Sequence, residues 1–145
     1  MTQHKSWFSA VGVMMLLGFS SHILAQNPAP KSAPNPGVTR TTLLQSDLSA
    51  PGRETIVVRV QLAPGVESGW HTHPGEEISY VSEGEINLMI AGQPYRKVPA
   101  GQALIVPAGK VHNAKNEGAI PAVLIVVYVV EKGKPLRTAA PEPAH

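Results

Sequence analysis

Short runs of β-type residues, each ended by glycine or proline, are the feature that most restricts the fold of this chain. Arg53–Leu62 (RETIVVRVQL) carries an apolar residue at every second position from Ile56 onward, as expected of a strand with one buried face. Ala63-Pro64-Gly65 then ends the run. The 145 residues include 13 Gly and 14 Pro, and no window keeps a helical 3.6-residue period. The sequence therefore predicts an all-β domain, either a sandwich or a barrel.

Further strands are expected at similar short spacing. They are Thr39–Leu44, Ile78–Ser82, Glu85–Ile90, Tyr95–Val98, Ala103–Val106 and Ala122–Val130. The last of these (AVLIVVYVV) is an almost unbroken apolar run, which is typical of a buried central strand. A single small sandwich leaves strand edges open, and edges are normally covered, so we expect a homodimer that pairs through its sheet edges.

The chain divides into four parts, of which residues 1–25 have the layout of a cleavable signal peptide. Lys5 precedes an apolar run that is too short to span a bilayer comfortably, and Ala25 supplies a small residue before the cut. Residues 26–37 carry four prolines and are predicted to be an extended linker. We expect one folded domain over residues 38–135, a disordered Pro/Ala tail over residues 136–145, and a periplasmic or secreted location.

Charge and composition argue against several classes of partner for the mature chain. Without the leader, which contains Lys5, the 12 Lys and Arg fall to 11 against 10 Asp and Glu, a charge near +1. This balance, with no basic stripe and no amphipathic helix, gives no reason to expect binding to nucleic acid or, after cleavage, to a membrane. Since the chain has no Cys, no disulfide framework is expected.

The placement of histidine is the strongest sign of chemistry. Four of the six His follow the leader, and His71 and His73 stand at alternate positions with Glu76 and Glu77 close behind. Alternate side chains of a strand share one face, so two imidazoles could chelate one metal ion, and one of the two carboxylates could join them. Taken alone, the two His fit a solvated or hydrogen-bonded pair without metal better than a metal site. His112 is the candidate for a third imidazole from the folded part of the chain.

Two longer patterns surround these residues, and together they resemble the motifs of the cupin family. Gly65-x5-His71-x-His73-x3-Glu77-x6-Gly84 is similar to the first cupin motif at every fixed position. Gly101-x5-Pro107-x-Gly109-x2-His112-x3-Asn116 is similar to the second motif to the same extent. A separation of 16 residues resembles that in small bacterial single-domain members. The resemblance covers about Val38–Pro135.

The resemblance implies a double-stranded β-helix, the jelly-roll barrel, that holds one divalent transition-metal ion. The implied ligands are His71, His73, Glu77 and His112, so the motif favours Glu77 over Glu76. Three nitrogens and one oxygen leave positions open on a six-coordinate ion, and they suit Mn, Fe, Ni or Zn without selecting among them. Asn116 is expected to tie a turn rather than to touch the metal.

Two functions fit this resemblance. The first is an exported metal-dependent enzyme of the dioxygenase, isomerase or lyase type, acting on a small organic substrate through residues that the sequence does not identify. The second is a non-catalytic cupin that binds or senses a small ligand or a metal. Activities of the oxalate and germin types usually accompany oligomer-forming helices or a second barrel, and neither is visible in this sequence.

Several aromatic and apolar side chains near the motifs lie outside their fixed positions. Alternation along the strand sends Trp70 away from the metal face. Met89 is expected to line the pocket. Tyr80, Tyr95 and Tyr128 could each supply a phenol to the pocket, although each is more often part of a core.

Overall fold

The computed structural model of this chain describes residues 35–144, a range that contains ten strands. The strands are β1 (Val38–Asp47), β2 (Arg53–Leu62), β3 (His71–Thr72), β4 (Gly75–Glu83), β5 (Glu85–Ile90), β6 (Arg96–Pro99), β7 (Ala103–Val106), β8 (His112–Lys115), β9 (Ala122–Glu131) and β10 (Thr138–Ala139). They form two five-stranded sheets, ordered β1-β2-β9-β4-β7 and β10-β3-β8-β5-β6. Within the described range, no helix is long and apolar enough to span a membrane.

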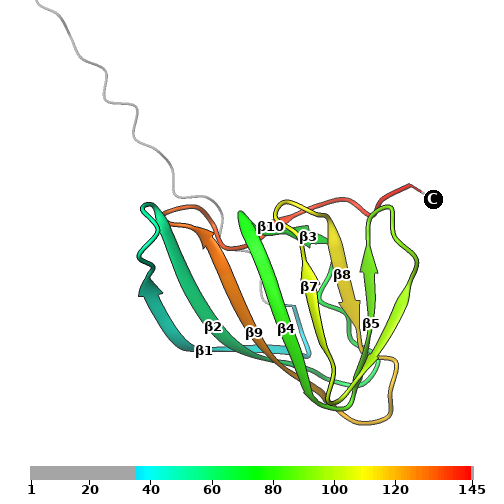
Figure 1. Cartoon of the computed structure of the whole chain (residues 1–145). Coiled ribbons are helices and arrows are strands. Elements are labelled where there is room, and N and C mark those ends of the chain that lie inside the picture. The colour runs from blue at the N-terminus through cyan, green and yellow to red at the C-terminus, as the bar shows by residue number, and fades with distance from the viewer. Residues whose placement is uncertain (1–34, 145) are drawn as a thin grey trace, which may run out of the picture.

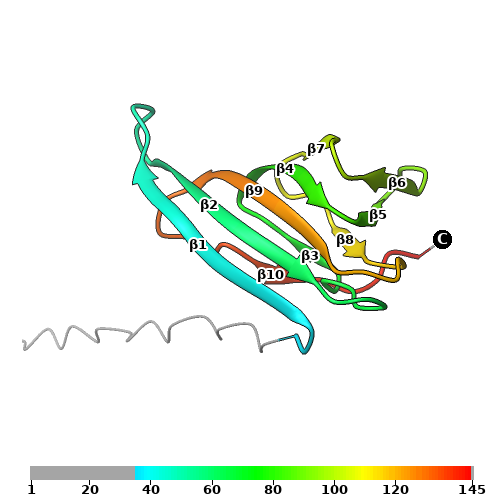
Figure 2. The same ribbon diagram turned by 90° about the horizontal axis from the view of Figure 1, so that it is seen from below.

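The two sheets face each other and form the walls of a barrel (Figure 1, Figure 2). Neighbouring strands are often far apart in sequence: β2 pairs with β9 along its whole length, and β3 pairs with β8. Because the pairing is antiparallel and the chain crosses repeatedly between the sheets, the topology is that of a double-stranded β-helix, or jelly roll. The predicted fold class is therefore confirmed.

Side chains that alternate along the strands fill the space between the sheets. In β2 every second residue is buried, so the apolar residues from Ile56 to Leu62 point inward as predicted. They join inward-facing residues of the other strands in one apolar cluster: Val81, Ile86, Leu88, Ile90, Val98, Leu104, Val106, Ala122, Leu124, Val126, Tyr128 and Val130. Burial of apolar surface stabilises a fold by about 25 cal/mol per Å², which makes this cluster the main source of stability.

Most strand boundaries agree with the prediction from sequence. The strands Arg53–Leu62, Glu85–Ile90 and Ala103–Val106 are observed as predicted, and the run that begins at Ala122 continues by one further residue to Glu131. β1 is longer than predicted, because a register shift lets it continue along β2 to Asp47.

Gly75 explains why β4 begins three residues before the predicted strand. A Cβ atom at this position would lie 2.0 Å from the backbone oxygen of Val129 on β9, so only glycine permits the two strands to approach here. The chain can then turn after His73 and return Glu77 to the interior. The first motif thus includes a steric requirement between its metal-donor positions.

Asn116 has the structural role that the sequence predicts for it. Its side-chain Nδ2 donates to the carbonyl oxygens of Leu62 (3.0 Å) and Ile120 (2.8 Å), and its Oδ1 accepts from the backbone N–H of Gly118 (2.9 Å). The fully buried amide therefore ties the β8–β9 turn to the end of β2.

The C-terminal tail corrects one prediction. The sequence predicts disorder over residues 136–145, whereas Thr138–Ala139 forms β10 and pairs with β3, and Leu136 packs against the core. The edge of β3 that does not pair with β8 offers backbone hydrogen-bonding groups, and a short segment can fill it whatever its side chains are. His145 lies outside the described residues.

The predicted signal peptide, residues 1–25, and linker residues 26–34 also lie outside the described range. The last linker residues, 35–37, form a turn in which Val38 N–H donates to Asn35 O (3.0 Å). The Asn35 side chain donates to the carbonyl oxygen of Glu67 (2.6 Å). This turn fixes the start of β1 beside the loop that leads into β3.

Candidate metal centre

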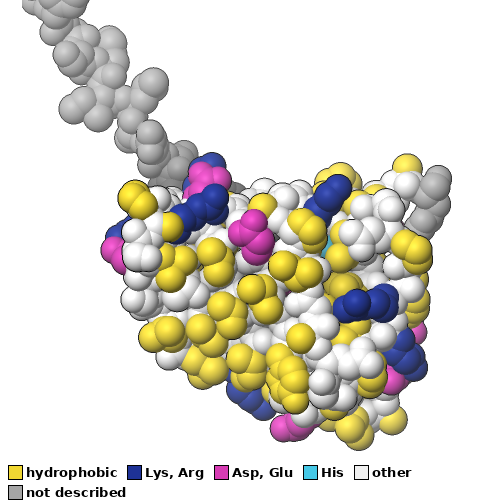
Figure 3. Space-filling model, viewed as in Figure 1, with side chains coloured by type: hydrophobic (Ala, Val, Ile, Leu, Met, Phe, Trp, Pro, Cys, Tyr) yellow, Lys and Arg dark blue, Asp and Glu magenta, His cyan; other side chains and the backbone are white. Residues whose placement is uncertain are grey.

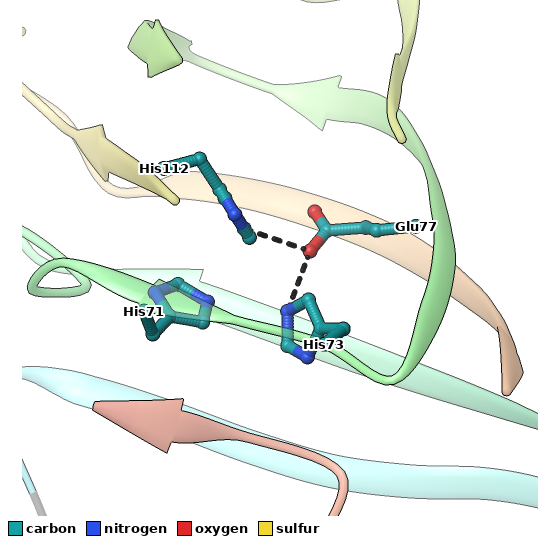
Figure 4. A group of neighbouring side chains, drawn as sticks. All are labelled: His71, His73, Glu77 and His112. Carbon is teal, nitrogen blue, oxygen red and sulfur yellow. Dashed lines mark hydrogen bonds and ion pairs between the residues drawn. The ribbon is translucent and has the colours of Figure 1, made fainter. Parts of the chain in front are cut away.

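Four donor side chains meet inside the barrel (Figure 4). His71 lies on β3, His73 directly after it, Glu77 on β4 and His112 on β8. One ligand atom from each lies within 4.8 Å of the others, and all four residues are buried. The structure therefore brings together the residues that the two motifs single out.

Strand pairing accounts for this convergence. His71 stands directly opposite His112 across β3 and β8, and their ring centroids are 4.2 Å apart. His73 shares the face of His71, at 4.8 Å between ring centroids. Glu77 approaches from the other sheet, and alternation along β4 turns its half-buried neighbour Glu76 to the opposite face.

Backbone carbonyl groups fix the protonation of all three imidazoles at the same ring atom. The Nδ1 atoms of His71, His73 and His112 lie 2.7, 2.5 and 2.9 Å from the carbonyl oxygens of Gly69, Leu136 and Lys110, respectively. Because a carbonyl oxygen only accepts hydrogen bonds, each Nδ1 carries the proton. In the neutral ring each Nε2 then presents a lone pair, as required of a metal ligand.

The Nε2 atoms of His73 and His112 lie 3.0 and 3.3 Å from Oε2 of Glu77. Ser79 donates to the other oxygen, Oε1, at 2.7 Å. The buried Nε2 of His73 has no well-aligned hydrogen-bond partner among the described residues. Lone pairs and a carboxylate that converge in this way repel one another unless a proton or a cation lies between them. The donor set therefore fits a divalent metal ion.

Burial and mutual repulsion favour the metal-binding protonation states. Burial, together with the nearby His112, lowers the pKa of His71 from 6.5 to about 3. Burial alone would raise the pKa of Glu77, but His112 and His73, which can donate to its carboxylate once an imidazole is protonated at Nε2, outweigh burial and hold that pKa well below its ordinary value. A neutral imidazole and an ionised carboxylate are the forms that coordinate metals.

A cavity of about 30 Å³ adjoins the donor cluster, which is room for an ion and very few further atoms. Its apolar walls are Val60, Leu62, Ile86, Leu88, Leu104, Ala114, Leu124 and Val126. Besides His71, Glu77 and His112, its polar lining consists of Arg40, Ser68 and Tyr128. Arg40, on β1, is a residue that the sequence analysis did not select, because nothing in its local pattern separates it from other surface arginines.

The structure also shows where the side chains of the three tyrosines, Trp70 and Met89 lie. Tyr128 lines the cavity, with its ring centroid 4.6 Å from that of His73, whereas Tyr80 and Tyr95 are exposed. Trp70 faces away from the donors, as predicted, and lines a separate surface groove. The expectation for Met89 is wrong: its side chain lies in that same groove, because the inward positions of β5 belong to Leu88 and Ile90.

The tail supports the cluster from outside. Leu136 supplies the carbonyl that accepts from His73, and Arg137 donates through Nη2 to the carbonyl oxygens of Ser68 (2.8 Å) and Gly69 (3.3 Å). The carbonyl oxygen of Gly69 also accepts a hydrogen bond from Nδ1 of His71. Residues just beyond the predicted domain boundary therefore orient two of the three imidazoles, which the Pro/Ala composition of the tail does not reveal.

A jelly roll with three imidazoles and one carboxylate in its interior defines a class of small β-barrels with a candidate metal site. The cupin domain family matches residues 58–128. Since the fold and the motif residues agree with that match, the chain belongs to the cupin superfamily.

Three proteins illustrate what this chain is similar to. Nectarin-1 of Nicotiana plumbaginifolia is 30% identical over 122 residues, which cover 76% of this chain and 50% of nectarin-1. Germin-like protein 1-1 of Oryza sativa subsp. japonica is 34% identical over 107 residues, covering 68% of this chain and 49% of that protein. A solved structure of oxalate oxidase in complex with the substrate analogue glycolate matches with a TM-score of 0.58 and 29% identity, over 74% of this chain and 56% of the other. The chain thus spans about half the length of these relatives.

The support from the tail can be tested by truncation. A chain that ends after Pro135 loses the carbonyl of Leu136 and the guanidinium of Arg137, and we expect its metal affinity to fall about 10- to 100-fold, as for other groups that orient metal ligands. A chain that ends after Ala140 keeps β10 and should bind metal as the full chain does. Competition titration against a chromophoric chelator measures both. Equal affinities for the two truncated chains would contradict this role of the tail.

Acid should destabilise the metal-free protein. Because the pKa of His71 is lower in the folded chain than its ordinary value of 6.5, its contribution to stability is present above pH 6.5 and is lost as the pH falls towards 3. From pH 7 to pH 5 we expect His71 to remove on the order of 1–2 kcal/mol from the free energy of unfolding. Urea denaturation with chelator present measures this loss. His71→Asn, which cannot titrate, should show a smaller loss, and an equal loss would argue against the effect.

Proposed function

We propose that His71, His73, Glu77 and His112 bind one divalent transition-metal ion and that the chain is a metal-dependent enzyme for a small organic substrate. The observation that carries this proposal is the convergence of three Nε2 lone pairs and one carboxylate on a buried cavity. A structural role alone would not need a cavity beside the donors. Metal sites that keep positions open are those that act on other molecules.

The donor set suits Mn, Fe, Ni or Zn. When bound, such an ion supplies Lewis-acid chemistry and, in the case of Mn or Fe, electron transfer as well. The chain's own contribution is to exclude water with the apolar walls and to orient the bound molecule. Tyr128 can donate a hydrogen bond to it, since burial and the charge of Glu77 raise the pKa of the phenol and keep it protonated.

The reaction types that fit this site are those of a dioxygenase, an isomerase or a lyase, in which the substrate is held through oxygen atoms. The relative oxalate oxidase binds glycolate as a substrate analogue, which supports a small, oxygen-bearing substrate for this chain as well. The layout of residues 1–25 supports export to the periplasm or the medium. Mass spectrometry of the exported chain tests this, with a start near Gln26 expected.

A second function has support from the cavity itself. Apart from the donor cluster, the described lining contains no carboxylate and no imidazole, and burial keeps its one phenol, Tyr128, protonated. This favours a non-catalytic cupin that captures a small ligand or a metal. Turnover by the metal-loaded protein separates the two functions.

The metal site predicts a clear difference between two adjacent carboxylates. Glu77→Ala, like Ala at any of the three His, removes a donor atom, so bound metal should fall sharply. Glu76→Ala changes a side chain on the opposite face and should leave the metal content unchanged. Saturating metal should add about 2.7 kcal/mol to the stability of the wild type at a hundredfold excess over Kd. Elemental analysis and thermal unfolding measure both effects.

A double variant, His71→Ala with His73→Ala, gives the decisive comparison for the site. These two side chains lie outside the apolar cluster, so the barrel should remain folded. Metal content equal to that of the wild type would refute the site and, with it, the enzymatic function.

The experiment for the function uses the mature chain loaded separately with Mn, Fe, Ni or Zn. Oxygen uptake and product formation are measured with catechols, diketones, flavonols and small carboxylates. We expect turnover with at least one metal and a loss of turnover in Glu77→Ala but not in Glu76→Ala. Stoichiometric metal and ligand binding without any turnover would instead establish the binding function.

We also infer a homodimer. Apolar side chains gather on the outer face over β4 and its neighbours (Figure 3), where Ile78, Tyr80 and Ile105 are 43, 47 and 57% exposed. A solvated patch of this kind, beside the edge strand β7, supports association of two copies. Light scattering that shows a monomer at high concentration would count against it.

A further inference from the structure

Arg40 faces the interior of the barrel although its side chain is exposed. In the β1–β2 pair it stands opposite Val60, whose side chain is buried in the core, and directly opposed residues of paired strands point to the same side. Arg40 accordingly lines the cavity together with His71, Glu77 and His112. Since β1 is the outermost strand of its sheet (Figure 2), this places a guanidinium at the rim of the candidate metal site.

Arg40 also marks where the cavity meets solvent. Among the described lining residues it alone is exposed; Ala114 is half-buried and the others are buried. A molecule that reaches the donor cluster by this opening must pass the guanidinium. Arg40 makes no hydrogen bond and no ion pair with residues 35–144, so its donors are available to a ligand.

The charges around the cavity favour an anion. Glu77 is the one carboxylate of the described lining, so a bound divalent ion, ionised Glu77 and Arg40 together would carry a net positive charge. The remaining walls are mostly apolar and screen these charges weakly. An anionic ligand would relieve this excess of positive charge.

We propose that Arg40 selects small carboxylate anions. Its guanidinium pairs with the carboxylate of the ligand, while a further oxygen of the same ligand, such as a hydroxyl, reaches the metal. This inference rests on the metal-dependent function proposed above and names its substrate class. A planar guanidinium matches a carboxylate with two parallel hydrogen bonds, which an amide or a neutral hydroxyl cannot reproduce. The small cavity, about 30 Å³, favours the smallest carboxylates.

The experiment compares glycolate with glycolamide, which keeps the hydroxyl and the chain length but has no charge. Calorimetric titration of the Zn-loaded mature chain should show glycolate binding at least about tenfold more tightly. Arg40→Gln should lose about tenfold or more in glycolate affinity and leave glycolamide affinity unchanged. Its zinc content should equal that of the wild type, because Arg40 supplies no atom to the donor cluster.

Arg59 provides the matched control. It lies on β2 between inward-facing Val58 and Val60, so its side chain is on the outer face, where it donates to Gln61 (3.1 Å). Arg59→Gln removes the same charge from the same sheet and should keep the preference for glycolate. If Arg40→Gln binds glycolate as the wild type does, or if the Zn-loaded wild type does not prefer glycolate, the role of Arg40 is overturned while the metal site stands. Failure of the wild type to bind zinc or the other three metals overturns the proposed function itself.

Discussion

The burial of three imidazoles and one carboxylate side by side is the constraint on which the rest of this structure depends. Polar groups lose hydration when they enter a core, and each must recover it through a specific partner. Here every Nδ1 is satisfied by a backbone carbonyl group and Oε1 of Glu77 by Ser79. What remains is a set of inward lone pairs around Oε2 of Glu77, which a cation satisfies. The loops and the tail that supply the carbonyl groups are therefore part of the site.

The two sheets divide the work between them. One sheet carries the His residues, with His71 and His112 in direct register across β3 and β8. The other carries Glu77 and Tyr128, which pair across β4 and β9. Since the sheets are held together by the apolar cluster between them, the distance between imidazoles and carboxylate is set by core packing. Packing and candidate chemistry are in this sense one feature of the barrel.

The short strands show where prediction from sequence stops. β2, β5, β7 and β9 follow from alternation or from continuous apolar runs, which are local patterns with a physical meaning. β3 and β10 have two residues each, too few for any period, and β10 exists because its backbone fills the free edge of β3. Met89 is a related case. Every position of β5 is buried or half-buried, so no alternation marks its inner face, and the direction of the Met89 side chain follows from how β5 pairs with β8.

The sequence by itself determined the all-β class and the core face of β2, because alternation along the chain fixes which side chains share a strand face. It also implied the four clustered donors, through the resemblance of its two motifs to those of cupins. The tertiary structure alone decided that residues 136–139 support His71 and His73, that Tyr128 rather than Tyr80 or Tyr95 enters the cavity, and that Arg40 stands at its opening. These contacts join segments from distant parts of the chain. Their positions follow from how the two sheets pair and face each other, which no local pattern records.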